Sequence, residues 1–164
     1  VYKDIPTWVK YVLIPIGSLI CVSLVVLAVI YEAGIILESK VYNGSELSDS
    51  HRIELINSGI IDESDEIKYF YTWGLFSITD GGSLLTNDKL VDYHKNKDGL
   101  LKTYKMMLEN VEKVELIKEG SEWSDSHYNV IGNENASYEK FEIFLSVSSG
   151  GDIKFINAIE ERIK

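Results

Sequence analysis

Cysteine and histidine are scarce in this sequence, and their scarcity excludes two common kinds of site. The single cysteine, Cys21, cannot form an intramolecular disulfide bond. Three histidines without paired spacing, together with a cysteine inside an apolar run, supply too few ligands for zinc. We therefore expect neither a disulfide framework nor a bound metal, and we expect no cofactor.

Basic residues are also few, with 16 Lys and Arg against 26 Asp and Glu. Up to residue 40 the basic and acidic side chains are equal in number, so the whole net charge of −10 belongs to the rest of the chain. An acidic domain repels phosphate backbones and anionic lipid surfaces. We therefore expect no nucleic-acid partner and no attachment to lipid through a polybasic patch.

Residues 11–30, YVLIPIGSLICVSLVVLAVI, are twenty residues without one charge. A helix of about 20 apolar residues is roughly 30 Å long and spans the hydrocarbon core of a bilayer. Aromatic rings that favour the headgroup region stand at its ends, at Trp8, Tyr11 and Tyr31. A buried soluble helix would show a polar stripe, and a cleaved signal peptide would be shorter. The sequence therefore predicts a flank over residues 1–10 and a single transmembrane helix over residues 11–37.

Small side chains lie close together in the first half of this predicted span. Pro15 favours a bend, and Gly17, Ser18 and Cys21 offer a surface on which another helix could pack. The alternative is that these residues simply face lipid. Two lysines precede the span and one follows soon after it, so the positive-inside rule favours an extracytoplasmic position for the following domain.

The rest of the chain predicts one α+β domain over residues 48–164, joined to the span by a linker over residues 38–47. Capping residues and apolar spacing predict helices over 48–58 and 152–163, the second capped by Asp152. Aromatic and β-branched runs predict a β region over 67–147, with strands at 67–73, 75–79, 83–86, 89–94, 101–108, 111–118 and 141–147. The sequences DGG at 80–82 and NKDG at 96–99 are typical of turns. Antiparallel strands of this kind form a small sandwich or partly open barrel, closed by the C-terminal helix.

Residues 67–93, IKYFYTWGLFSITDGGSLLTNDKLVDY, resemble the pleckstrin-homology-like (PH-like) domains of bacterial membrane proteins. An aromatic hairpin there leads through paired glycines into an LTxxKLVxY strand, and the segments at 111–116 and 148–159 are also similar. The resemblance implies a PH-like sandwich with a capping helix, and a single-pass protein of the bacterial inner membrane. It transfers no functional residues. The hairpin at 69–85 lacks the Lys and Arg that bind phosphoinositide headgroups, so headgroup binding is not expected there.

Three further patterns bear on chemistry. Ser-Asp-Ser-His occurs at 48–51 and at 124–127, but a catalytic triad needs residues brought together from distant positions, so we expect a helix cap and a loop. The acidic stretch 62–66 lacks the features of an EF-hand loop and is interpreted as a solvated linker. Because no nucleophile, base and metal grouping is present, we expect no enzymatic activity.

Aromatic side chains are densest in residues 69–76, and they give the candidate partner surface: Tyr69, Tyr71, Trp73 and Phe76. The leading hypothesis is a membrane-tethered, non-catalytic adaptor or accessory subunit of a membrane complex, which binds protein partners through this domain and its anchor helix. The alternative is a sensor or binding module that holds a small ligand or envelope component at the open end of the sheet.

Overall fold

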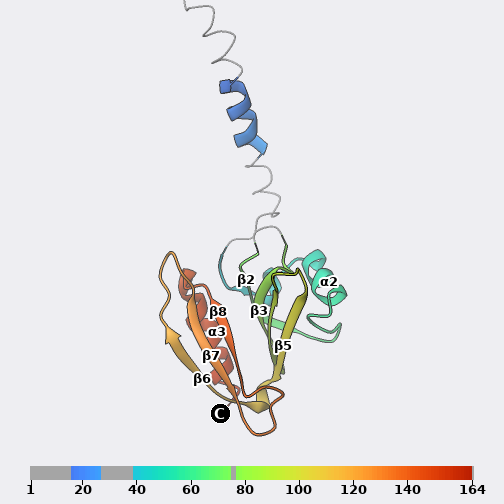
Figure 1. The fold of residues 1–164 in the computed structure, drawn as a ribbon, viewed down its shortest axis with the longest axis vertical. Helices are drawn as coiled ribbons and strands as arrows, with labels where there is room; N and C mark the ends of the chain where they lie inside the picture. Colours follow the sequence, from blue (N-terminus) through green and yellow to red (C-terminus); the bar gives the residue numbers. More distant parts are fainter. Residues whose placement is uncertain (1–15, 27–38, 75–76, 164) are drawn as a thin grey trace, which may run out of the picture. The chain divides into compact units, whose positions relative to one another are not determined.

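The computed structural model describes residues 16–26, 39–74 and 77–163. The chain divides into two compact units, Val1–Leu37 and Glu38–Lys164, which are considered separately. In the first unit residues 16–26 form a helix, in which the Ser23 hydroxyl donates a hydrogen bond to the Leu19 carbonyl at 2.9 Å (Figure 1). Among the residues that the structure describes, no helix combines the length and the apolar character needed to cross a bilayer.

The helix at 16–26 lies within the predicted span of residues 11–37, whose two ends fall outside the described residues. Gly17, Ser18 and Cys21 belong to the helix, and Cys21 is exposed. The other predicted anchor residues, Trp8, Tyr11, Pro15 and Tyr31, lie outside the described residues.

The second unit contains two antiparallel sheets (Figure 1). The first sheet has strand order β1-β2-β3-β4-β5, and the second has order β6-β7-β8. Their bounds are β1 Tyr42–Asn43, β2 Ile67–Thr72, β3 Gly81–Thr86, β4 Lys89–Lys95, β5 Leu101–Met107, β6 Val111–Lys118, β7 Ser126–Gly132 and β8 Lys140–Leu145. Within each sheet, strands that follow one another along the chain are paired, so each sheet is an antiparallel meander.

Two helices complete this unit. Helix α2, Asp49–Asn57, begins at Ser48, whose hydroxyl accepts a hydrogen bond from the His51 amide, and ends before Gly59, which has a positive φ of 70°. It lies on the side of the first sheet away from the second sheet (Figure 1). Helix α3, Gly151–Glu160, presents apolar side chains at helical spacing to the core between the sheets. Short 3₁₀ turns lie at Gly44–Glu46, Leu108–Asn110 and Ser148–Gly150.

The main core fills the space between the two sheets. In β8 the side chains alternate, so that Phe141, Ile143 and Leu145 are buried while the residues between them are exposed. They pack with Leu85, Leu90 and Met106 from the first sheet and with Phe155 and Ile159 from α3. A further group of buried side chains comes from the outer face of the first sheet and from α2 and the loops beside it: Leu55, Ile60, Ile61, Phe70, Ile78, Leu84, Val91 and Tyr93.

Four sequence-based expectations differ from the structure. Residues 42–46, placed in the linker, form β1 and a 3₁₀ turn, because Tyr42 and Asn43 pair with β2. Residues 77–79 of the predicted strand 75–79 lie in a turn, in which the Asp80 amide donates a hydrogen bond to the Ser77 carbonyl, and residues 75–76 lie outside the described residues. Gly81 and Gly82, predicted in a turn, are strand residues of β3. Strand β7, the centre of the second sheet, was not predicted.

The start of α3 also differs from its prediction. Gly150, with a left-handed φ of 68°, precedes the helix, and Asp152 lies inside its first turn. The buried Asp152 carboxylate accepts hydrogen bonds from the Ser126 hydroxyl at 2.6 Å and the Tyr128 hydroxyl at 3.4 Å. Asp152 therefore joins the helix to β7 instead of capping it.

Candidate functional site

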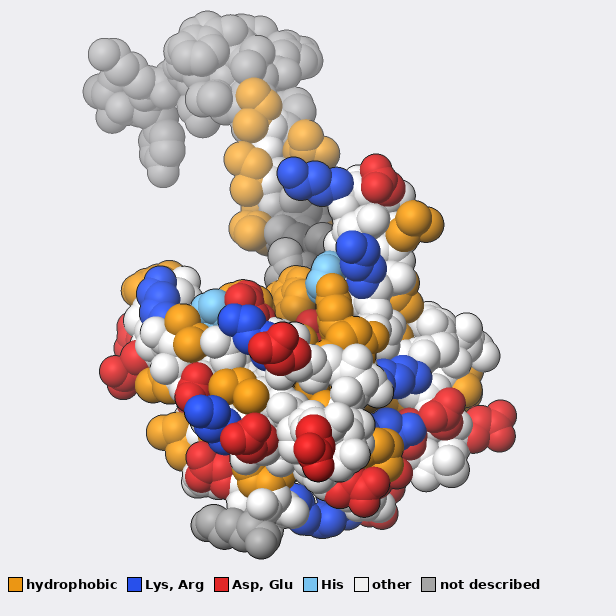
Figure 2. Space-filling model, turned by 60° about the horizontal axis from the view of Figure 1, so that its bottom comes forward, with side chains coloured by type: hydrophobic (Ala, Val, Ile, Leu, Met, Phe, Trp, Pro, Cys, Tyr) orange, Lys and Arg blue, Asp and Glu red, His pale blue; other side chains and the backbone are white. Residues whose placement is uncertain are grey.

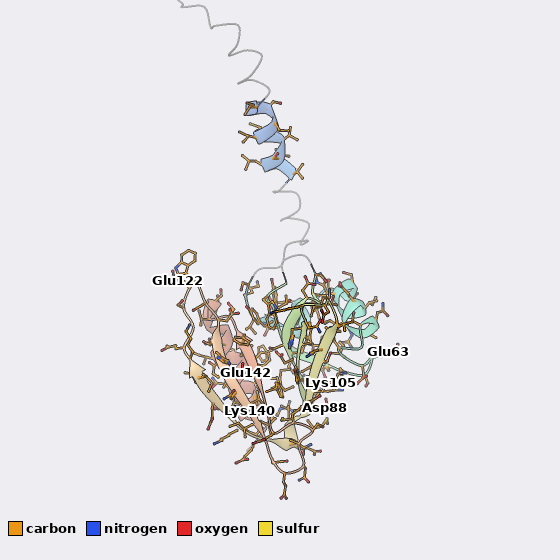
Figure 3. All side chains as sticks on the ribbon, in the orientation of Figure 1. Glu63, Asp88, Lys105, Glu122, Lys140 and Glu142 are labelled. Carbon is orange, nitrogen blue, oxygen red and sulfur yellow. The ribbon has the colours of Figure 1, made fainter. Side chains whose placement is uncertain are left out.

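A cleft of about 610 Å³ opens between β4 and β5 of the first sheet and β8 of the second. On the face of β4 that lines the cleft, the core residue Leu90 is followed by the polar residues Asp92 and His94. Its lining residues are Trp73, Asp92, His94, Tyr104, Asp125, Lys140, Phe141, Glu142 and Phe144. Figure 3 shows Lys140 and Glu142 on β8, in the second sheet. Volumes of about 300 to 1,000 Å³ are typical of small-molecule sites.

Asp92 is the buried polar group of this cleft. The strand register aligns Tyr71, Ser83, Asp92 and Tyr104 in one row across the first sheet, and residues in such a row share a face. Asp92 is 4% exposed, and one carboxylate oxygen accepts a hydrogen bond from the Ser83 hydroxyl at 2.8 Å. Burial raises the pKa of Asp92 to about 7, and the Ser83 hydrogen bond opposes that shift only in part.

Aromatic rings line the cleft on both sheets. The Trp73 and Phe144 rings meet edge to face with centroids 6.4 Å apart. The Tyr104 ring stacks on His94, with centroids 5.9 Å apart, and on Phe141, with centroids 6.1 Å apart. These two groups of rings, each with members from both sheets, form the aromatic walls of the cleft.

The position of Trp73 depends on a glycine. A Cβ atom at residue 81 would collide with the Trp73 indole, so the glycine lets the ring lie against the backbone of β3. The Trp73 amide donates a hydrogen bond to the Gly81 carbonyl at 3.3 Å. Gly81, which the sequence analysis placed in a turn, therefore serves the close approach of an aromatic ring.

The second sheet carries one further group beside the cleft. The His127 ring on β7 stacks on Phe144 with centroids 4.5 Å apart, and its Nε2 lies 3.2 Å from a carboxylate oxygen of Glu142. This imidazole supports one aromatic wall from behind and places a titratable group next to Glu142.

The predicted partner surface does not form one exposed face. Tyr71 is buried, and its hydroxyl donates a hydrogen bond to Asp125 at 2.6 Å. Desolvation, together with that hydrogen bond, raises the pKa of Tyr71. Tyr69 is half-buried, and the centroid of its ring lies 6.2 Å from that of the Phe155 ring of α3. Trp73 is 38% exposed and lines the cleft, whereas Phe76 lies outside the described residues.

Apart from Asp125, which belongs to the Ser-Asp-Ser-His segment at 124–127, the sequence does not single out the other residues of the cleft. Asp92 gave a usable signal, since it interrupts the apolar run at 90–93 on a predicted strand. Tyr104 and Phe144 lack such a signal, because they come from different sheets and meet in one cleft only when the two sheets close.

The two Ser-Asp-Ser-His segments bond to separate partners. Ser48 caps α2, as expected. In the second segment Asp125 accepts a hydrogen bond from Tyr71, Ser126 donates to Asp152, and His127 stacks on Phe144.

In the acidic stretch at 62–66, carboxylate oxygens of Asp62 and Asp65 each lie 2.9 Å from the Lys89 ammonium nitrogen. That ion pair lowers the pKa of Asp62.

A five-stranded and a three-stranded antiparallel sheet, followed by a C-terminal helix, define the fold as α+β and PH-like. The chain is similar to a solved structure from Shewanella loihica PV-4, described as a DUF1696 family protein with a pleckstrin-homology domain. The TM-score is 0.50 at 11% sequence identity, and the match covers 77% of this chain and 100% of that chain. No family model and no curated protein matches the sequence. The PH-like fold predicted from residues 67–93 is therefore confirmed.

Proposed function

We propose that this protein is a non-catalytic, membrane-tethered binding module whose PH-like domain holds a ligand in the cleft between its sheets. The observation that carries the proposal is the cleft itself, a concave site with aromatic walls and the buried carboxyl of Asp92. Binding sites of this kind combine a mainly apolar lining with a few polar groups that fix orientation. Trp73 thereby takes the role of a ligand contact.

The tether rests on the uncharged segment at residues 11–30 and the aromatic residues at its ends. Extraction of membranes with alkaline carbonate tests it. The full chain is expected to remain with the bilayer, and its release into the carbonate wash would contradict the tether.

A thermal-shift screen of small fragments against the full chain, purified in a maltoside detergent, tests binding at the cleft. Hits are expected to raise the melting temperature of the wild-type chain and of Trp123→Leu, and to lose that effect in Trp73→Leu. The two variants make the same chemical change, because Trp73 lines the cleft while Trp123 lies outside its lining. A screen without hits, or hits that Trp73→Leu leaves unchanged, would contradict this proposal.

A second candidate function is an adaptor that docks a protein partner, and one observation favours it. Trp123, next to Glu122 at the tip of the β6–β7 loop (Figure 3), is 93% exposed, and Leu116 and Ile117 are exposed on β6. Exposed tryptophan is enriched at protein interfaces. Fragment hits that depend on Trp123 and not on Trp73 would favour this second candidate.

A further inference from the structure

The aromatic walls and the carboxylates of the cleft together restrict the chemistry of its ligand. The face of an aromatic ring carries partial negative charge and attracts a cation placed over it. Trp73 and Phe144 form one pair of rings in the lining of the cleft, and Tyr104 and Phe141 form a second pair. A rounded, weakly hydrated cation can contact several of these rings at once.

The charged side chains that line the cleft also favour a cation. Asp92, Asp125 and Glu142 are acidic, whereas Lys140 is the one lysine among the lining residues. The chain as a whole carries a net charge of −10. On the face in Figure 2, acidic and basic side chains are interspersed. An anionic ligand would lie beside three acidic side chains and one lysine, so the lining favours a cation over an anion.

We infer that the cleft recognises an organic cation, an alkylated ammonium group, through its aromatic walls and its carboxylates. This inference rests on the proposed binding function and names the ligand class for that site. The quaternary or methylated ammonium group lies against the aromatic walls, with Asp92 and Glu142 supplying the counter-charge. The cleft volume of about 610 Å³ exceeds that of one such group, which leaves room for the remainder of a larger ligand.

Binding of a cation at this site depends on pH. Ionised Asp92 attracts the ammonium group and protonated Asp92 does not, so affinity rises as the pH increases through about 7. The other titratable or charged groups that line the cleft come from three strands and one loop: His94 on β4, whose Nδ1 lies 4.0 Å from an Asp92 carboxylate oxygen, Tyr104 on β5, Asp125 in the loop before β7, and Lys140 and Glu142 on β8. Replacement of Asp92 by asparagine separates its contribution from theirs, since the amide does not titrate.

Calorimetric titration of the full chain in maltoside detergent with choline tests the inference. The matched control ligand is 3,3-dimethylbutan-1-ol, which replaces the trimethylammonium group of choline with a neutral tert-butyl group of the same shape. Choline is expected to bind at least about tenfold more tightly than the alcohol. Trp73→Leu is expected to weaken choline binding about tenfold, and Trp123→Leu is expected to leave it unchanged.

Two neighbouring residues of β8 give effects of opposite sign. Glu142→Gln is expected to lower choline affinity about threefold at low salt, and Lys140→Gln is expected to raise it by about the same factor. Damage to the fold would weaken binding in both variants, so the gain for Lys140→Gln is the specific result. Nanodiscs of phosphatidylcholine, compared with free choline, show whether a lipid headgroup or a soluble cation supplies the ammonium group.

Equal affinity for choline and the neutral alcohol, or preferential binding of inorganic phosphate, would overturn the organic-cation inference while the binding module stands. Binding of none of these probes, together with a fragment screen without hits, would instead remove the proposed binding function. A choline affinity that Lys140→Gln lowers would also count against the inference.

Discussion

Replacement of Asp92 by asparagine is expected to stabilise the domain at pH 8 by up to about 4 kcal/mol and to change its stability little at pH 4. The reason is the cost of an ionised carboxylate in the wall of the core. The pKa of Asp92 is about 7 in the folded domain against an ordinary value of 3.8, because burial disfavours the charged form. The Ser83 hydroxyl donates to this side chain, and it can donate equally to the asparagine carbonyl.

The direction of this effect follows from proton binding. Between about pH 4 and pH 7 the folded state holds a proton on Asp92 that the unfolded state has released. The free energy of unfolding of the wild type therefore falls as the pH rises through this range, and it levels off above about pH 7. In Asp92→Asn this contribution is absent, so the difference in the free energy of unfolding between the variant and the wild type grows with pH.

Urea denaturation at a series of pH values measures this difference. Asp98→Asn, an exposed aspartate in the turn between β4 and β5, is the matched control and is expected to follow the wild-type curve. A difference between Asp92→Asn and the wild type that stays constant from pH 4 to pH 8 would show that Asp92 does not titrate near neutrality.

Phe155→Ala is expected to lower the free energy of unfolding by about 3 to 5 kcal/mol. Phe155 is fully buried in α3, where it lies in the core between the two sheets and contacts the Tyr69 ring. Its removal leaves a cavity at the junction of both sheets and the helix. Because small domains are stable by only about 5 to 15 kcal/mol, the variant loses a large share of its stability.

Ile153→Ala on the same helix is the control, since Ile153 is 59% exposed. Its effect is expected to stay within about 0.5 kcal/mol, as for most surface substitutions. Chemical denaturation followed by circular dichroism gives both values. If the two substitutions cost the same, α3 does not close the core in the way described.

The parts of the fold that could be predicted are those that leave a local pattern. The alternation in β8, the NKDG turn at 96–99 and the apolar spacing of Phe155, Ile156 and Ile159 in α3 each reflect one buried face beside one solvated face. Strand β7 was missed because its buried face includes Ser126, a polar residue whose partner, Asp152, lies 26 residues away. A short stretch of sequence around Ser126 does not contain the carboxylate that accepts its hydrogen bond, so it gives no indication that this hydroxyl can be buried.

The cleft was harder to predict for a similar reason. In β3 all six residues are buried, because the first sheet packs against the second sheet on one face and carries α2 on the other. The neighbouring strand β4 is likewise buried from Leu90 to Tyr93. Neither strand shows an alternation, so the sequence does not indicate which face Asp92 occupies. Trp73 was selected as an aromatic residue of the hairpin, but its neighbours in the cleft, Tyr104 and Phe144, come from strands that meet only after the sheets close.

The central claim, that this domain binds ligands in the cleft, is tested most directly by fluorine NMR of the full chain labelled with 5-fluorotryptophan. The chain has three tryptophans, at positions 8, 73 and 123, and single Trp→Phe variants assign their signals. During titration with a fragment hit or with choline, the Trp73 signal is predicted to shift in a saturable way while the Trp8 and Trp123 signals stay in place. A static Trp73 signal beside a shifting Trp123 signal would contradict the account and place recognition on the β6–β7 loop.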